Sequence, residues 1–449
     1  AAAAKAEMKA LMRGAVHSYL EYAIDYASAG MYEEAAQLLS FVTEENEATY
    51  PMVYYALGYF ASKMGKKDEA LNLYKKAETM CPDYCFPNKL EEVLMLNDAM
   101  SLNPEGAKAP YYLGNFHYAA RIYDEAIACW EKSASIDDTY PTVLRNLSLA
   151  YYNKQHNPQK ALATLEKAYN LDTTDARILM ELDQLYKKLR YPHRQRLDFL
   201  EAHADVVEQR DDLCIERITL YNQLGEYQKA YDLINSRKFH PWEGGEGKVT
   251  SQYLLCRVEL AKIAIREGRF ADAVRLLKET EKYPDNLGEG KLSMAEENDI
   301  HYWMGCAYEG LGEEALAKEY FTKATKGSAE PAIAFFYNDQ QPDKIFYQGL
   351  AWRKLGEEDK ARSRFNRLIK HGEKHLFDKV KIDYFAVSLP DLLIWDDDLN
   401  VRNQIHCNLV MGMGYLGLGD KEQARKFLSE VARLDINHQA GKQLLEMCG

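Results

Sequence analysis

Residues 54–82 read YYALGYFASKMGKKDEALNLYKKAETMCP, and this stretch decides the fold. Small residues recur on both sides of a glycine turn: Gly58 and Ala61 precede Gly65, and Ala70 and Ala77 follow it. The acidic pair at 68–69 suits the positive end of a helix dipole, as at the start of a helix. The stretch therefore predicts two short antiparallel helices joined at residue 65. Helices of about 12–15 residues are marginal alone, so such pairs must pack on one another.

The same pattern recurs along the whole chain. Its turn residue stands at Gly30, Gly65, Arg121, near Gln155, near Arg190, and at Gly225, Gly268, Gly312, Gly356 and Gly419. An alanine follows as Ala35, Ala70, Ala126, Ala161, Ala230, Ala273, Ala317, Ala361 and Ala424. Early spacings are close to 35 residues and later ones are 43 or 44, while spacings of 56 and 63 mark insertions near 83–106 and 371–400. A period in this range indicates a repeat architecture. The unit near 190 is the least regular, with Arg194 close to its alanine position.

These residues resemble the tetratricopeptide repeat. The resemblance implies an all-α fold, a right-handed α-α superhelix of about ten helical hairpins, with longer loops in the later units. It divides the chain into repeats of about 35 residues over 16–237, repeats with extended loops over 238–395, and a C-terminal repeat with a capping helix over 396–449. It also implies that large side chains fill the gaps between hairpins, namely Leu57, Tyr74, Leu113, Trp130, Leu147, Leu165, Met304, Phe321, Trp352 and Phe365.

The composition narrows the classes of function. The 449 residues carry a net charge of −13, which disfavours nucleic acid as a partner. No apolar run approaches the ~20 residues that a membrane span needs. Eight cysteines are scattered without a Cys/His cluster, so we expect reduced thiols, no metal and no cofactor, and a cytoplasmic location. The chain begins with Ala1 and without a methionine, which suggests a trimmed terminus, so the lack of an export signal says nothing about export.

Two loops echo each other at 240–249 and 283–292. Both read aromatic-Pro, then Gly-Glu-Gly-Lys, then an aliphatic residue, and they lie 43 residues apart, which is the local repeat period. Insertions on one edge of a solenoid often carry function. We weigh a structural role for the glycines against docking of a partner or adjoining domain through Trp242, Glu243, Glu246 and Lys248. Catalysis by the two glutamates lacks a fixed carboxylate separation, and a phosphate cradle lacks the Ser/Thr after Lys248.

The first of these loops resembles a signature in the C-terminal repeat region of large bacterial proteins of unknown function. In those proteins a β-sandwich domain, reminiscent of sugar-handling enzymes, precedes the repeats. The resemblance is best over about 200–449. It implies that this chain lacks the catalytic-looking front half, and it leaves the ligand of the repeats open.

The tetratricopeptide resemblance also implies a concave groove. In that family, four positions of the first helix of each repeat face the groove. In three successive repeats here they are Met52, Tyr55, Tyr59 and Ser62, then Lys108, Tyr111, Asn115 and Tyr118, then Thr142, Arg145, Leu149 and Tyr152. Asn115 and Asn146 fall at or near the two asparagines with which some family members hold a peptide's terminal carboxylate. Tyr111, Ala176 and Met180 replace the basic residues of that clamp, which argues against it. Tyrosine offers an apolar body with a polar tip, as recognition surfaces use.

Three classes of function remain open. The first is a non-catalytic scaffold that binds a peptide, a protein or an adjoining domain in the groove. The second is an accessory region of a larger carbohydrate-active bacterial enzyme, whose loops shape a sugar site. The third is a structural module for oligomerisation. Since no catalytic constellation accompanies the repeats, we expect no enzyme activity.

Overall fold

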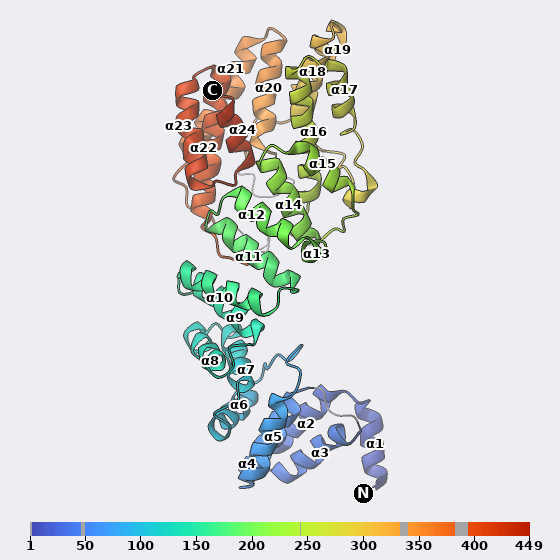
Figure 1. Ribbon diagram of the computed structural model, residues 1–449, viewed down its shortest axis with the longest axis vertical. Helices are drawn as coiled ribbons and strands as arrows, with labels where there is room; N and C mark the ends of the chain where they lie inside the picture. The colour runs from blue at the N-terminus through green and yellow to red at the C-terminus, as the bar shows by residue number, and fades with distance from the viewer. Residues whose placement is uncertain (1, 46–49, 243, 333–339, 382–393) are drawn as a thin grey trace. The chain divides into compact units, whose positions relative to one another are not determined.

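The computed structural model describes residues 2–45, 50–242, 244–332, 340–381 and 394–449. Within these ranges the regular structure is entirely helical (Figure 1). The all-α prediction is confirmed. The chain forms two compact units, Ala1–Thr173 and Thr174–Gly449, which we call unit 1 and unit 2. The predicted divisions near 237 and 395 follow repeat length and remain predictions. No helix in the described ranges is long and apolar enough to cross a membrane.

Unit 1 contains ten helices in its described residues. They are α1 (Ala2–Met12), α2 (Val16–Ser28), α3 (Tyr32–Glu45), α4 (Met52–Lys63), α5 (Lys67–Glu78), α6 (Leu90–Leu102), α7 (Lys108–Ala119), α8 (Tyr123–Ile136), α9 (Pro141–Asn153) and α10 (Pro158–Leu171).

Unit 2 holds the remaining helices. They are α11 (Ala176–Lys188), α12 (His193–Ala202), α13 (Ala204–Val207), α14 (Asp211–Gln223), α15 (Tyr227–Asn235), α16 (Lys248–Arg266), α17 (Phe270–Lys278), the 3₁₀ turn η1 (Asp285–Leu287), α18 (Asn298–Gly310), α19 (Glu314–Ala324), α20 (Pro342–Lys354), α21 (Glu358–His375), α22 (Leu399–Leu418), α23 (Lys421–Leu434) and α24 (Gln439–Glu446).

Ten helical hairpins stand in the described chain, as predicted: α2/α3, α4/α5, α7/α8, α9/α10, α11/α12, α14/α15, α16/α17, α18/α19, α20/α21 and α22/α23. The first insertion supplies α6, a helix without a hairpin partner of its own. Around the second insertion, α21 and α22 are longer than their counterparts, at 18 and 20 residues. Residues 382–393 of that insertion lie outside the described ranges.

The small residues of the repeat let the two helices of a hairpin touch. In nine hairpins the fourth residue of the second helix is alanine, and eight of these nine alanines have no exposed surface. A Cβ added to Gly58 would lie 2.4 Å from the ring of Tyr74, and one added to Gly114 would lie 2.4 Å from Trp130. Real side chains do not approach so closely, so glycine makes room for the aromatic ring. Eight of the ten predicted gap-filling side chains are buried; Leu57 and Trp352 are half-buried.

The turns adopt the conformation that the sequence predicts. The predicted turn glycines have φ values from 75° to 85°, in the left-handed region. Arg121 and Arg190 take the same region without being glycine, with φ of 63° and 62°. In the hairpin α9/α10, whose turn is predicted near Gln155, the residue in the left-handed region is His156, one place later. The connections of α9/α10 and α11/α12 are both one residue longer than that of α4/α5, but only in α9/α10 does the left-handed residue move one place along.

Unit 2 closes on itself. Its C-terminal segment returns toward its first helices (Figure 1), and residues 395 and 434–437 contact α11, α12 and the turn between them. Trp395 is buried and donates from Nε1 to the carbonyl of Glu181, 214 positions earlier, at 3.1 Å. Arg190 donates to the carbonyl of Leu434 at 2.8 Å. An open solenoid makes contacts only between neighbouring hairpins. These contacts between distant hairpins give unit 2 a different organisation.

Candidate binding surfaces

The predicted groove of unit 1 contains a chain of amide contacts between α7 and α9. Asn115 Oδ1 accepts hydrogen bonds from Trp130 Nε1 at 3.1 Å and from Asn146 Nδ2 at 3.2 Å. Arg145 Nη1 donates to Asn146 Oδ1 at 3.2 Å. Trp130 is buried, while both asparagines and Arg145 are half-buried. The structure thus brings Asn115, Asn146 and Arg145 together as one polar group on neighbouring first helices.

The tyrosines of the groove divide into two classes. Tyr55 and Tyr111 are 0% and 5% exposed, so their rings belong to the packing between hairpins. Tyr55 donates to Glu78 Oε1 at 2.9 Å, and burial together with Glu78 raises its pKa well above the usual value. Tyr59, Tyr118 and Tyr152 are half-buried and leave part of each ring at the surface. Of the candidate site residues predicted for the groove, the accessible ones are therefore these three tyrosines, the two asparagines and Arg145.

The two echoing loops of unit 2 bind each other. Phe239 N donates to the carbonyl of Asn286 at 2.8 Å, and Asn286 Nδ2 donates to the carbonyls of Ile234 and Arg237 at 2.9 and 3.0 Å. Gly288 has φ of 78°, and a Cβ there would lie 2.6 Å from the Phe239 oxygen. The second loop is therefore fixed against the segment 234–239 that leads into the first loop, and it needs glycine at this point.

The Gly-Glu-Gly-Lys motifs make a second contact between the loops. Glu289, from the later motif, accepts from Gly247 N at 3.0 Å and from Thr250 Oγ1 at 3.4 Å. Burial raises the pKa of Glu289, although these hydrogen bonds favour its charged form. The contact fixes the beginning of α16, where a carboxylate also suits the helix dipole.

The predicted docking residues of the first loop are placed as follows. The Trp242 ring lies against Gly245, because a Cβ there would be 2.0 Å from its Cε2 atom. Glu246 and Lys248 are exposed, the latter as the first residue of α16. Glu243 lies outside the described residues.

A hollow of about 520 Å³ lies beside the second loop. Two tyrosines of α15 and α16 meet charged residues of α17 and the following loop, and the lining consists of Tyr231, Tyr253, Lys278, Glu279, Glu281, Lys282, Tyr283, Pro284 and Asp285. Arg257 lies next to this lining: its guanidinium carbon is 4.4 Å from the centroid of the Tyr231 ring, and it forms an ion pair with Glu279. Aromatic faces beside mixed charges are able to hold a polar ligand with an apolar face.

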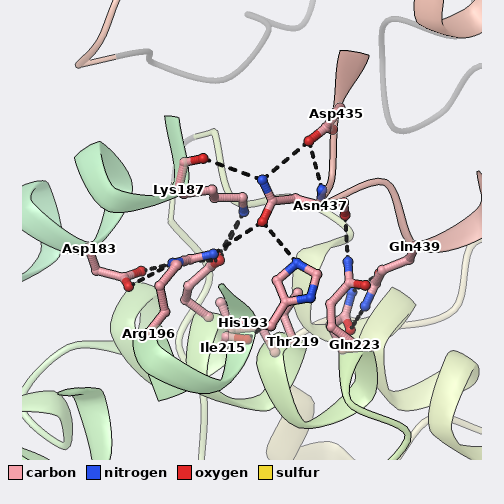
Figure 2. A network of polar contacts seen from close by, with 12 residues as sticks. Asp183, Lys187, His193, Arg196, Ile215, Thr219, Gln223, Asp435, Asn437 and Gln439 are labelled. Atoms are coloured by element: carbon pink, nitrogen blue, oxygen red, sulfur yellow. Dashed lines mark hydrogen bonds and ion pairs between the residues drawn. The ribbon is translucent and has the colours of Figure 1, made fainter. Parts of the chain in front are cut away.

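A buried ionic cluster joins α11, α12 and α14 (Figure 2). Arg196 donates from Nε and Nη2 to the Asp183 carboxylate at 3.0 and 2.6 Å, and from Nη2 to Glu216 Oε1 at 2.7 Å. Lys187 adds a contact to Glu216 at 2.9 Å. Arg196 and Asp183 are each 1% exposed. Burial alone would raise the pKa of Glu216, but Lys187 and Arg196 hold it well below its usual value.

Asn437 connects this cluster to the C-terminal segment (Figure 2). Its Oδ1 accepts from Arg196 Nη1 at 3.3 Å and lies 3.2 Å from His193 Nε2, while its Nδ2 donates to the carbonyl of Lys187 at 3.4 Å. Gln223 donates to the carbonyl of Asn437. The charges of the cluster face opposite charges, and through Asn437 the cluster is joined to the C-terminal segment of unit 2.

Comparison with known proteins agrees with the repeat pattern. Two tetratricopeptide repeat families match the chain, one over residues 53–84 and 299–326 and the other over 345–371. These segments cover much of α4/α5, α18/α19 and α20/α21. The chain contains tetratricopeptide repeats.

Solved structures show limited similarity. PilF of Pseudomonas aeruginosa is 19% identical, with 49% of this chain and 90% of that chain covered and a TM-score of 0.29. YrrB, whose title describes a tetratricopeptide repeat protein with an unusual peptide-binding site, is 17% identical over 49% and 96%, with a TM-score of 0.29. A Naa15/Naa10 complex bound to HypK is 10% identical over 96% and 65%, with a TM-score of 0.35.

In the repeating pattern of the sequence, Arg196 occupies the alanine position. It is the fourth residue of α12, as Ala161 is of α10. Arg194, which the sequence places near this position, is exposed and pairs with Glu226. Asp183 stands 13 residues before Arg196, as Ser148 stands 13 before Ala161. In α11/α12, charged residues therefore replace the small residues found at these two positions of α9/α10. This replacement is the feature of the sequence that could have predicted the buried ion pair.

Proposed function

We propose that this chain is a non-catalytic scaffold that binds an extended peptide segment of a partner protein in the unit 1 groove. The observation that carries the proposal is the chain of side-chain contacts from Trp130 through Asn115 and Asn146 to Arg145. Asparagine amides donate and accept hydrogen bonds, and a peptide backbone offers the same two groups at every residue. The half-buried Tyr118 and Tyr152 lie on the same two helices as the asparagines and supply apolar area, and Tyr59 adds a further half-buried tyrosine on α4.

The arrangement favours recognition of the backbone over recognition of a terminal carboxylate. The amide chain carries one cation, Arg145, which already donates to Asn146. Tyr111, where a clamp would have a basic residue, is buried. We therefore expect internal segments of a partner to bind as well as free C-termini.

Fluorescence anisotropy with a library of extended peptides tests the groove. Asn115→Ala, Asn146→Ala and Tyr118→Ala each remove one contact, and each should weaken the selected peptide about tenfold. Asn97→Ala is the matched control, because Asn97 is an exposed helical asparagine that donates to the carbonyl of Val93 in its own helix. Unchanged affinity in all three groove variants would reject the proposal.

A second candidate function rests on the hollow beside the second loop. Three tyrosines with mixed charges in about 520 Å³ suit a polar ligand such as an oligosaccharide, as expected of an accessory region of a carbohydrate-active enzyme. Docking of an adjoining domain through Trp242, Glu246 and Lys248 belongs to the same proposal. Calorimetric titration with oligosaccharides should show binding that Tyr231→Ala and Tyr283→Ala weaken. Absence of heat with every sugar tested would remove this candidate.

A further inference from the structure

Four large apolar side chains of the first insertion face solvent. Tyr84 is 89% exposed, Phe86 65%, Leu90 74% and Leu94 56%. Leu90 and Leu94 lie one turn apart on the same face of α6. We call these four residues the α6 patch. Single exposed apolar residues are ordinary, but a group of them marks an interaction site.

The segment that carries the patch is fixed from within. Burial alternates along it: Cys85 and Pro87 are buried, while Tyr84 and Phe86 point outward. Burial among its neighbours raises the pKa of the Cys85 thiol to about 12. Glu92 then accepts hydrogen bonds from the backbone nitrogens of residues 88 and 89 at 2.7 and 2.9 Å, which caps the start of α6. Two aromatic rings are thus held outward by an ordered backbone.

The exposed face of α2 adjoins the patch. Lys89, which precedes α6, forms an ion pair with Glu21 of α2. Next to Glu21, Tyr22 is 54% exposed, and one turn later Tyr26 is 39% exposed. The tyrosines of α2 therefore extend the apolar surface beyond the insertion.

The charges around this surface are acidic. Asp83 and Glu91 flank the patch and are exposed, as are Glu21 and Asp25 on α2. Lys89 is the one lysine or arginine of the segments 16–28 and 83–94, where His17 is the other basic residue, and Lys89 is paired with Glu21. A partner complementary to the surface carries apolar side chains and positive charge.

We propose that the α6 patch and the neighbouring face of α2 dock a basic amphipathic helix of a partner protein. Apolar anchors spaced by one helical turn and rimmed by acidic groups match a helix with leucine-like residues on one face and Lys or Arg beside them. A second copy of this chain brings a net charge of −13 and the same acidic rim, and an anionic membrane is negative as well. Both are repelled. The site shares no residue with the unit 1 groove.

The probe is a fluorescein-labelled model peptide of about 18 residues with leucine and lysine in helical spacing, so that it forms about five turns. Its affinity for the full chain is measured by anisotropy at low and at physiological salt. The double variant Leu90→Ser/Leu94→Ser should bind at least tenfold more weakly, since two apolar anchors are lost. Glu91→Lys should weaken binding several-fold at low salt. A peptide with glutamate in place of lysine should not bind.

Matched controls separate the patch from general attraction to an acidic protein. Leu292→Ser/Met294→Ser removes two exposed apolar side chains of unit 2, 54% and 86% exposed, and should leave the affinity unchanged. Asn115→Ala should do the same. Equal affinity of Leu90→Ser/Leu94→Ser and the unaltered chain would overturn the proposal. So would dimerisation in sedimentation, or binding to phosphatidylserine vesicles, that the double variant abolishes.

Discussion

Arg121 and Arg190 have the left-handed backbone conformation that the eight other hairpin turns of the described chain place at a glycine or at His156. A side chain in the left-handed region places its Cβ close to the following carbonyl, which costs about 1 kcal/mol relative to glycine. Arg190 gains a hydrogen bond to the carbonyl of Leu434 in return. Arg121 is exposed, so it offers a simple test of this cost.

Arg121→Gly should raise the free energy of unfolding by about 1 kcal/mol, because it removes the strained Cβ. Urea denaturation followed by circular dichroism measures the change. Gly65→Ala, at a turn with φ of 79° and open space around it, is the reverse control and should lower stability by about as much. A loss of stability in Arg121→Gly would show that the arginine side chain compensates for its backbone.

His406 should make unit 2 sensitive to acid. Burial, with the neighbouring imidazoles of His371 and His438, lowers its pKa to about 4, below the ordinary value of about 6.5. Above pH 6.5 both folded and unfolded forms are neutral. As the pH falls from 6.5 to 4 the unfolded chain takes up the proton first, so up to about 3 kcal/mol of stability is lost. Thermal midpoints at pH 7 and pH 5 should differ less in His406→Gln than in the exposed control His17→Gln. Equal pH dependence in both would contradict this assignment.

At the scale of the element, the hairpin α11/α12 differs from the others in what joins its helices. Where α9 and α10 meet through Ser148, which donates to the carbonyl of Ala161 at 2.7 Å, α11 and α12 meet through the Asp183–Arg196 pair. A buried ion pair often contributes no more than well-packed apolar residues, whereas a single unpaired charge left behind is costly.

This difference gives a double-mutant prediction. Arg196→Ala leaves Asp183 buried without its main partner and should cost about 3–5 kcal/mol. The double variant Asp183→Ser/Arg196→Ala recreates the pair found in α9/α10 and should be more stable than Arg196→Ala alone. Chemical denaturation of the two variants provides the coupling free energy. If the double variant were the less stable of the two, the comparison between these hairpins would be invalid.

The helices and turns were largely predictable, because the small residues and the turn residue that define each hairpin lie within about 35 residues of one another. Gly58 opposite Tyr74, the left-handed turns and the alanine at the fourth position all depend on neighbours close in sequence. The candidate sites were less predictable. Tyr55 and Tyr59 share one helix face by spacing alone, yet one is buried and the other is half-exposed, because a neighbouring hairpin covers the first. The bond from Trp395 to Glu181 spans 214 positions, which no periodic pattern encodes.

At the scale of the whole molecule, unit 2 depends on its last residues. Beyond Asn437, the side chains of Gln252 and Gln439 exchange hydrogen bonds at 3.0 Å, and Lys442 donates to the carbonyl of Gln223. These contacts join hairpins that an open stack would leave apart.

Asn437→Ala should therefore loosen both ends of unit 2 at once. It removes contacts to Arg196, His193 and the carbonyl of Lys187, and it should cost about 2 kcal/mol. Hydrogen exchange should rise together in 176–200 and 435–446. Asn235→Ala is the control, since Asn235 is exposed and donates to the carbonyl of Tyr231 in its own helix. Faster exchange confined to 435–446 would mean that the C-terminal segment does not support α11 and α12.

The closure of unit 2 also limits which duplications or deletions of hairpins its gene tolerates. Stacks of hairpins commonly grow or shrink by duplication or loss of one unit, because each hairpin needs only its neighbours. Between α11 and α24 such an event would separate Asn437 from Arg196 and Trp395 from Glu181, leaving buried charges and an indole without partners. Descendants of this sequence should accordingly vary in hairpin number before residue 174 and keep the same count after it.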